Sequence, residues 1–167
     1  ENSVASFPNK STFNYVIVAV KDQDKTLLLD ATDKNATINT LPIRCLNWIG
    51  RLIHDDGTST EINLMPEIKS LNAINMMAEI LESGEVNGKI RKQYFDYNAY
   101  LYRDKNNGVA TESLIERTER KFTGVEITDY STQNNTDLTL PIIENYSFSS
   151  DNLVETIGNT MYISPML

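Results

Sequence analysis

The sequence predicts an α+β protein that is mainly β, with antiparallel hairpins, a sandwich-like sheet and two short helices. Three observations support this fold class. Short β-branched and aromatic runs recur along the chain, turn residues separate several of them, and helical periodicity is confined to the region around residues 97–123. The order of elements, strands then helices then strands without an internal repeat, is typical of an α+β or sandwich-like arrangement.

The first predicted element is a hairpin. Residues 13–20 are β-branched and aromatic, lack Gly and Pro and are apolar on both faces, which is typical of a central strand buried on both sides. Residues 21–25 form a polar turn, and residues 26–30 return as the antiparallel partner. Because a five-residue turn between two apolar runs favours this pairing, we expect Tyr15 to lie near Asp30.

The next segment is irregular until a second hairpin begins. Residues 31–47 show no period and contain Pro42, which predicts a long connection. Residues 50–54 and 59–64 are two short strand-like runs. In the turn between them, Gly57 supplies the positive φ that a tight hairpin requires.

A domain boundary is predicted at Pro66, which cannot donate to a strand ladder and favours an extended residue before it. It separates a first domain, residues 1–66, from a second domain, residues 67–167. The second domain begins with a long hairpin of residues 71–82 and 86–95, because a short Gly-containing connection lies between two strand-like runs.

Two helices and a final group of strands complete the second domain. The helices are expected near residues 97–105 and 111–123. Gly108 ends the first, and an apolar stripe that stops at Gly124 defines the second. The remaining predicted strands are residues 125–130, 142–148 and 160–164.

Charge and composition exclude several classes of function. With 15 Lys and Arg against 23 Asp and Glu the net charge is −8, so we expect no nucleic-acid partner. The densest basic run, residues 89–92, lies inside an alternating strand pattern and indicates a solvated face. No stretch approaches the ~20 apolar residues that a membrane-spanning helix requires.

The chain offers few residues for catalysis or metal binding. Cys45, His54 and Asp56 could supply a nucleophile, a base and an orienter, but His54 and Asp56 bracket a turn and Cys45 lies in an apolar run, so we expect no catalytic unit. One His and one Cys leave no ordinary zinc site, so no metal is expected. No glycine motif for phosphates or dinucleotides is present, and no cofactor is expected.

A family resemblance takes the functional interpretation further. Residues 13–20, followed by residues 28–33, resemble the end of the transglutaminase-like cysteine-enzyme core. In that family one strand carries the catalytic histidine, and the next ends in a catalytic aspartate within an Asp-x-Thr sequence, which here is Asp30. The whole pattern is similar to bacterial envelope proteins in which such a core is followed by a β-rich domain of unknown function. The likeness extends through residues 41–51, 85–88 and 97–103.

The resemblance implies a degenerate catalytic site. Tyr15 stands where the family commonly has histidine, and a phenol cannot accept a thiol proton at neutral pH. The family's nucleophilic cysteine precedes the aspartate, whereas Cys45 follows Asp30. We therefore expect a non-catalytic accessory, scaffolding or binding fragment of a larger exported protein, periplasmic or at the cell surface. The alternative is part of an active cysteine peptidase or acyltransferase whose nucleophile lies upstream and to which this segment supplies Asp30.

Further expectations concern partners. They include the remainder of the polypeptide and an envelope protein or glycan. An adhesion or carbohydrate-binding module would require an exposed row of aromatic residues, but core packing is the favoured interpretation of the tyrosines available. Those tyrosines are Tyr94, Tyr97, Tyr100 and Tyr102. The apolar residues 13–30 also predict a homodimer contact, unless residues 31–66 or the second domain cover them.

Overall fold

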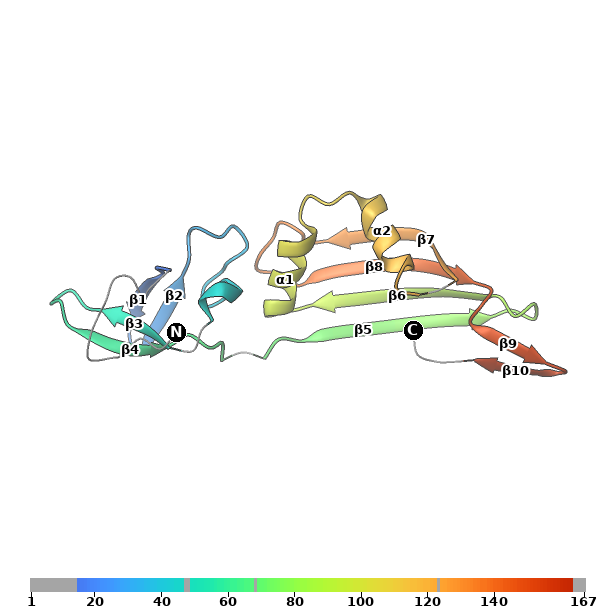
Figure 1. The fold of residues 1–167 in the computed structure, drawn as a ribbon, viewed down its shortest axis with the longest axis horizontal. Helices are drawn as coiled ribbons and strands as arrows, with labels where there is room; N and C mark the ends of the chain where they lie inside the picture. Colours follow the sequence, from blue (N-terminus) through green and yellow to red (C-terminus); the bar gives the residue numbers. More distant parts are fainter. Residues whose placement is uncertain (1–14, 47–48, 68, 123, 164–167) are drawn as a thin grey trace. The chain divides into compact units, whose positions relative to one another are not determined.

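The computed structural model describes residues 15–46, 49–67, 69–122 and 124–163. The chain divides into two compact units, Glu1–Lys69 (unit 1) and Ser70–Leu167 (unit 2). Antiparallel strands dominate both units, and the described part of unit 2 adds two helices (Figure 1). The predicted α+β, mainly β fold class is therefore confirmed.

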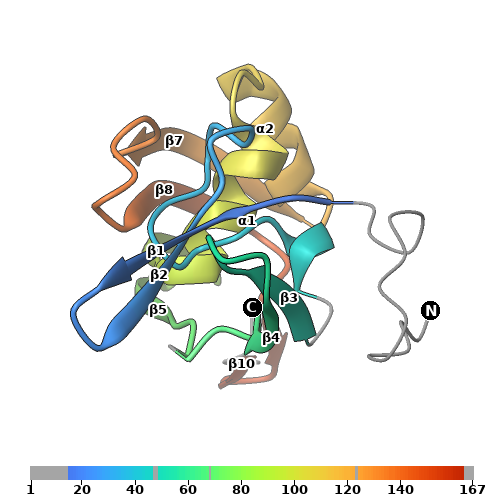
Figure 2. The ribbon, with the colours of Figure 1, turned by 90° about the vertical axis from the view of Figure 1, so that its left-hand side faces the viewer.

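Unit 1 begins with the predicted hairpin. β1 (Val18–Asp22) and β2 (Lys25–Leu29) pair antiparallel, with Val18 opposite Leu29 (Figure 2). Gln23, in the turn, has a positive φ of 52°, as a two-residue hairpin turn requires. The predicted pairing is confirmed, but the predicted five-residue turn is wrong, because the ladder continues to the pair Asp22–Lys25 and leaves a turn of only two residues. β1 begins at Val18; residues 13 and 14 lie outside the described part of the chain.

Only one face of this hairpin is covered by other described residues. On one side, Ile17 and Leu28 pack against a small core supplied by the rest of unit 1. On the other side, Val16 is 85% exposed and Val18 is 55% exposed. The prediction of a strand buried on both sides is therefore wrong for the described chain, because the connection and the second hairpin cover it from one side only.

The segment after the first hairpin supplies that core. Leu41, Cys45 and Leu64 are buried, and a 3-10 turn, Ile43–Cys45, lies within the otherwise irregular connection. β3 (Ile49–Ile53) and β4 (Ser59–Asn63) then form the second hairpin. Its turn contains Gly57 with φ +82°, the conformation that the sequence predicts.

Unit 2 is built on a four-stranded antiparallel sheet. Its strands are β5 (Asn72–Ile80), β6 (Val86–Tyr94), β7 (Val125–Gln133) and β8 (Ile142–Ser150). They lie in the order β5-β6-β8-β7 (Figure 1). β5 and β6 form the long hairpin expected from the sequence, and a last hairpin of β9 (Val154–Ile157) and β10 (Thr160–Ile163) follows β8.

The two edges of this sheet differ. On β7, the register with β8 shifts between Ile127 and Asp129, which marks a β-bulge. A bulge twists an edge strand and disturbs its ladder of hydrogen-bonding groups. β5 pairs with β6 without interruption and contains one charged residue, Glu79. The regular edge of the sheet is therefore that of β5.

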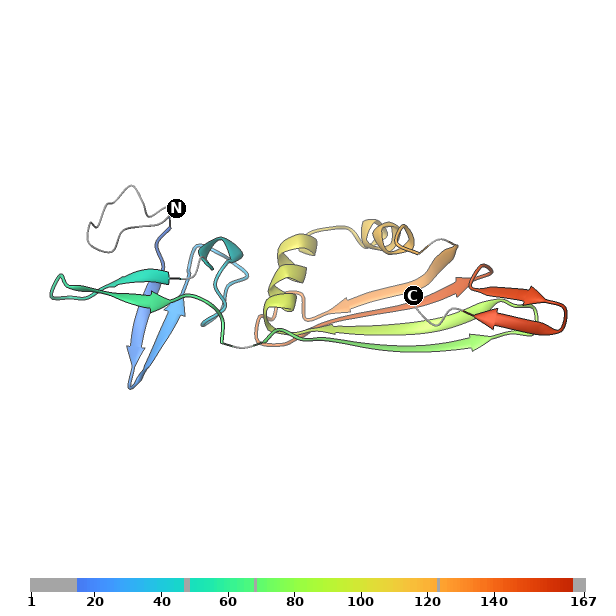
Figure 3. The same cartoon turned by 60° about the horizontal axis from the view of Figure 1, so that its bottom comes forward.

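Both helices lie on one side of the sheet (Figure 3). They are α1 (Asp96–Asn106) and α2 (Thr111–Glu119). α2 ends earlier than the predicted residue 123, because the amides of Lys121 and Phe122 bond to carbonyls three residues back and tighten the chain into a turn. The two helices therefore form the layer that covers one face of the sheet.

The main apolar core lies between the helices and the sheet. Its buried members are Val86, Ile90, Val125, Ile127, Tyr146 and Phe148. Along β8, every second residue from Ile142 to Ser150 is buried and those between are half-buried, the alternation of a sheet that is covered on one face. We call the other face the open face. It consists of the intervening residues of the four strands, among them Asn75, Met77, Lys89, Arg91, Asp129, Asn145 and Ser147.

Candidate functional site

The two residues that the resemblance singles out, Tyr15 and Asp30, contact each other. Asp30 follows β2 directly and Tyr15 lies three residues before β1, so antiparallel pairing brings them together. The Tyr15 hydroxyl donates to Asp30 Oδ2 at 2.5 Å. Asp30 Oδ1 accepts from the Thr32 amide at 2.8 Å and from its hydroxyl at 2.7 Å. The predicted proximity is confirmed, and both carboxylate oxygens are occupied.

Arg44, from the 3-10 turn, completes this cluster. Its Nη2 donates to the Tyr15 hydroxyl oxygen at 2.7 Å, and its guanidinium lies 4.8 Å from the centre of the Tyr15 ring. Its Nη1 lies 3.4 Å from Asp33 Oδ2. The phenol oxygen therefore donates to one neighbour and accepts from another. Such an oxygen holds a fixed hydrogen-bonding position and has no role as a proton acceptor at neutral pH.

The environment keeps Asp30 ionised. Burial by itself would raise the pKa of Asp30, but the hydrogen bonds from Tyr15 and Thr32 outweigh it and lower that pKa below the ordinary value. The charge of Arg44 acts in the same direction. The cluster is therefore a carboxylate held by two hydroxyls and an amide, with a cation beside it.

The second set of sequence candidates does not assemble. Cys45 is 4% exposed and belongs to the core of unit 1, and burial raises the pKa of its thiol, with the charge of Asp30 adding to the effect. His54 and Asp56 lie on the exposed β3–β4 turn, where Asp56 accepts from Thr58. The charged neighbours of Cys45 are Asp30, Arg44 and Asp33, and His54 is not among them. This cysteine is a small core residue without an activating base.

The four tyrosines between residues 94 and 102 belong to the interior of unit 2 or to its margin. Tyr97 and Tyr100 are buried, while Tyr94 and Tyr102 are half-buried and point at the carboxylate of Glu144. Tyr130 donates to the same carboxylate at 2.5 Å. The row of exposed aromatic side chains that a carbohydrate-binding surface would require is therefore not formed by residues 94–102.

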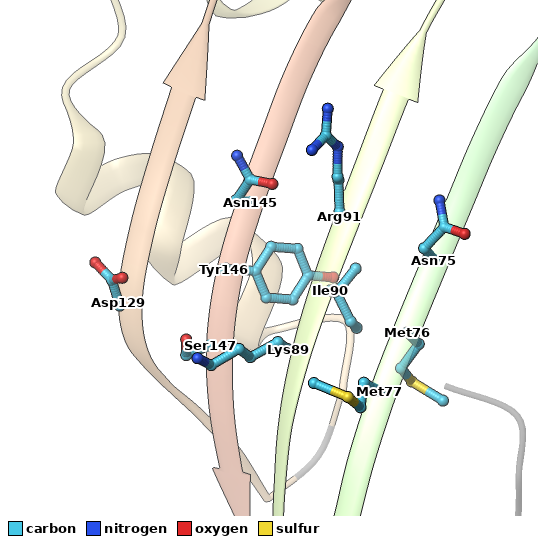
Figure 4. A pocket seen from close by; sticks show the side chains of 10 residues that line it. All are labelled: Asn75, Met76, Met77, Lys89, Ile90, Arg91, Asp129, Asn145, Tyr146 and Ser147. Carbon is cyan, nitrogen blue, oxygen red and sulfur yellow. The ribbon is translucent and has the colours of Figure 1, made fainter.

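The sequence analysis overlooked a hollow on the open face of unit 2. Its volume is about 370 Å³. Figure 4 shows its side chains, which come from all four strands, with the helices behind the sheet. The residues around it are Asn75, Met76, Met77, Lys89, Ile90, Arg91, Asp129, Asn145, Tyr146 and Ser147. The one signal for it in the sequence is the basic run of residues 89–92 inside an alternating strand pattern, which predicts only a solvated face.

Comparisons with known proteins identify no relative: no family model, no curated protein and no solved structure matches the chain. Among the described residues, no three His, Cys, Asp or Glu side chains are grouped so that they could hold a metal ion. No helix in the described ranges has the length and apolar character to span a membrane.

Proposed function

We propose that this chain is a non-catalytic binding or scaffolding module of a transglutaminase-like, exported bacterial envelope protein. The observation that carries the proposal is the contact between Tyr15 and Asp30. In the family that the sequence resembles, the orienting aspartate holds the imidazole of the general base, as in other catalytic triads. Here a phenol takes that position, and the site keeps the hydrogen-bonding frame of a triad without its base.

The state of Cys45, the one cysteine of the chain, supports the same conclusion. Thiol chemistry requires a thiolate, which a neighbouring imidazolium, a cation or a metal normally stabilises. The pKa of the Cys45 thiol is raised by burial, and the thiol faces the core. Its nearest cation, Arg44, is already paired with Asp33 and the Tyr15 hydroxyl. Tyr15, Asp30 and Arg44 then stabilise unit 1, as part of a structural cluster that links the first hairpin to the connection.

The alternative, in which an upstream cysteine uses Asp30 for catalysis, rests on the ionised state of that carboxylate. It requires an imidazole to reach one oxygen of Asp30. Tyr15 donates to one oxygen and Thr32 to the other, so the imidazole would have to share an oxygen with one of them or displace it.

Peptide hydrolysis and amine transfer by the chain, measured for the unmodified protein and for Cys45→Ala, test the proposal. We expect no turnover above the uncatalysed rate in either protein. Turnover that Cys45→Ala abolishes would overturn the proposal. As a second measurement, a thiol reagent should modify Cys45 slowly in the folded protein and rapidly in urea, because the folded protein buries the thiol.

The alternative has its own test in the longer parent protein. Asp30→Asn leaves the parent's behaviour in both assays unchanged if the site is non-catalytic. A parent that hydrolyses peptides and loses this activity on Asp30→Asn would establish the alternative instead. Tyr15→Phe serves as the matched control, because it removes a hydrogen bond to the same carboxylate and leaves Asp30 itself in place.

A further inference from the structure

We propose that the open face of unit 2 is a binding site for a small acidic sugar, that is, a hydroxylated ligand with one carboxylate or phosphate group. The inference concerns unit 2 alone and does not depend on the function proposed from unit 1. It rests on the hollow of about 370 Å³ and on the side chains that line it. Small-molecule sites typically have volumes of roughly 300 to 1,000 Å³, so the hollow suits a ligand of modest size.

Two cations occupy the middle of the open face. Lys89 and Arg91 lie two residues apart on β6, so both side chains leave the same face of the sheet, about 7 Å apart along the strand. Figure 4 shows them between the side chains of the two flanking strands. Asn145 of β8 lies opposite Arg91, and Ser147 opposite Lys89. The strand pairing thus surrounds the two positive charges with an amide and a hydroxyl.

Neither cation has a partner among the described residues. The chain has 23 acidic residues against 15 basic ones, so carboxylates are available to pair with exposed cations. The other arginines, Arg44, Arg51, Arg103, Arg117 and Arg120, each donate a hydrogen bond within the described structure. Arg91 is the one arginine of the described residues whose side chain makes no hydrogen bond or ion pair, and that of Lys89, like those of the other described lysines, makes none either. Their donors are available to a ligand.

The chemistry of the lining residues selects the ligand class. A guanidinium binds a carboxylate or phosphate through two parallel hydrogen bonds, and the ammonium of Lys89 adds a positive charge to the same region. Asn75, opposite Arg91 on β5, and Asn145 each offer a donor and an acceptor, which suits sugar hydroxyls. Met77 is 71% exposed beside Lys89 and provides an apolar contact for the ring.

Asp129 restricts the number of negative charges that the site accepts. It lies on β7 opposite Ser147, at the far side of the hollow from Met77. Its carboxylate accepts hydrogen bonds from hydroxyl groups and repels a second anion. The arrangement therefore fits a ligand that places one anionic group over the cations of β6 and hydroxyl groups on the side of the hollow nearer β7. Polyanions such as nucleic acids match it poorly.

Backbone amide NMR titrations of the full chain with D-glucuronate, glucose 6-phosphate and glucose test this site. We expect saturable shifts confined to β5, β6, β7 and β8 with one or both acidic sugars and no saturation with neutral glucose. A response to glucuronate alone identifies a carboxylate as the anionic group, and a response to glucose 6-phosphate alone identifies a phosphate. No saturable shift with either acidic sugar would overturn the proposal.

Two variants locate the binding. Arg91→Met should weaken it by about 10- to 100-fold, the value of a charge-assisted hydrogen-bonding group. Arg120→Met is the matched control, because Arg120 is an exposed arginine at the end of α2, away from the open face. If both variants bound the acidic sugar with equal affinity, the proposed location of the site would be wrong. Urea unfolding of each variant verifies that it is folded, which is expected because both side chains are exposed.

Discussion

Glu144 is a buried carboxylate that accepts hydrogen bonds from three tyrosines of unit 2, and its removal tests how much this network stabilises the unit. The residue lies on β8 and is 7% exposed. Tyr130 donates to its Oε1 at 2.5 Å, and Tyr94 donates to its Oε2 at 2.8 Å. Tyr102 adds a longer contact of 3.4 Å. We expect Glu144→Ala to be strongly destabilising.

The magnitude follows from the hydrogen bonds that are lost. Glu144→Ala leaves the hydroxyls of Tyr130 and Tyr94 without their acceptor, and each unsatisfied hydroxyl costs about 1–3 kcal/mol, so the free energy of unfolding should fall by about 2–6 kcal/mol. Glu144→Gln preserves the shape and one acceptor oxygen. Its cost should be about 1–2 kcal/mol, because charge-assisted bonds become neutral ones.

Urea unfolding followed by circular dichroism measures these losses, provided that the slope of the transition is unchanged. Glu126→Ala is the control, since Glu126 is exposed on the neighbouring strand β7 and its loss should change stability by less than about 0.5 kcal/mol. If Glu144→Ala also changed stability by less than about 0.5 kcal/mol, water would have replaced the carboxylate, and the assigned role of Glu144 would be wrong.

Burial, with the charge of Glu144, raises the pKa of the surrounding tyrosines, that of Tyr102 to about 12. These phenols ionise near pH 10 in the unfolded chain and at higher pH in the folded protein. The free energy of unfolding should therefore fall between about pH 10 and 12, by up to about 1.4 kcal/mol per pH unit for each tyrosine. An ultraviolet titration in which every tyrosine of the folded protein ionises near about pH 10 would contradict this. Gly88→Ala should cost about 1–3 kcal/mol in thermal unfolding, because the added methyl group overlaps the Phe148 ring; an unchanged melting temperature would show that the ring yields. The pKa of Asp30 is lower in the folded protein than in the unfolded chain. Ionised Asp30 therefore stabilises unit 1 fully above about pH 4, and this stabilisation is lost as the pH falls through the pKa of the folded state. Asp30→Asn should therefore make the free energy of unfolding in urea depend less on pH below about pH 4. The same pH dependence in both proteins would show that Asp30 does not stabilise unit 1 through its charge.

Local patterns predicted the elements well, because each depends on neighbouring residues. The polar residues 21–25 between two apolar runs were sufficient to pair the first two strands and to place Tyr15 beside Asp30, although the turn itself is two residues long. Gly57 and Gly108 were sufficient to locate a hairpin turn and the end of a helix. Burial was harder, since an apolar run records how much surface a strand can bury and not whether other residues cover both faces. Val16 and Val18 show the difference.

The two polar clusters of unit 2 could not be predicted from the sequence, because they are built across the sheet. Glu144 meets Tyr94 and Tyr130, which lie 50 and 14 residues away in the chain. The hollow on the open face likewise draws its lining from all four strands, in an order that differs from the order of the chain. No local period encodes such an order. The transglutaminase-like origin, the export and the predicted homodimer through residues 13–30 stay predictions.

The difference between the two edges of the unit 2 sheet affects how copies of this protein can associate. An incoming strand finds regular hydrogen-bonding groups along β5, where Ile74 is 63% exposed, and an interrupted ladder along β7. Growth of a cross-β fibre requires that each added copy present a second competent edge. When a sheet has only one such edge, two copies can pair through it, and no regular edge is left for a third copy. The bulge between Ile127 and Asp129 therefore limits association through β7, and a variant without it would have regular hydrogen-bonding groups at both edges of the sheet.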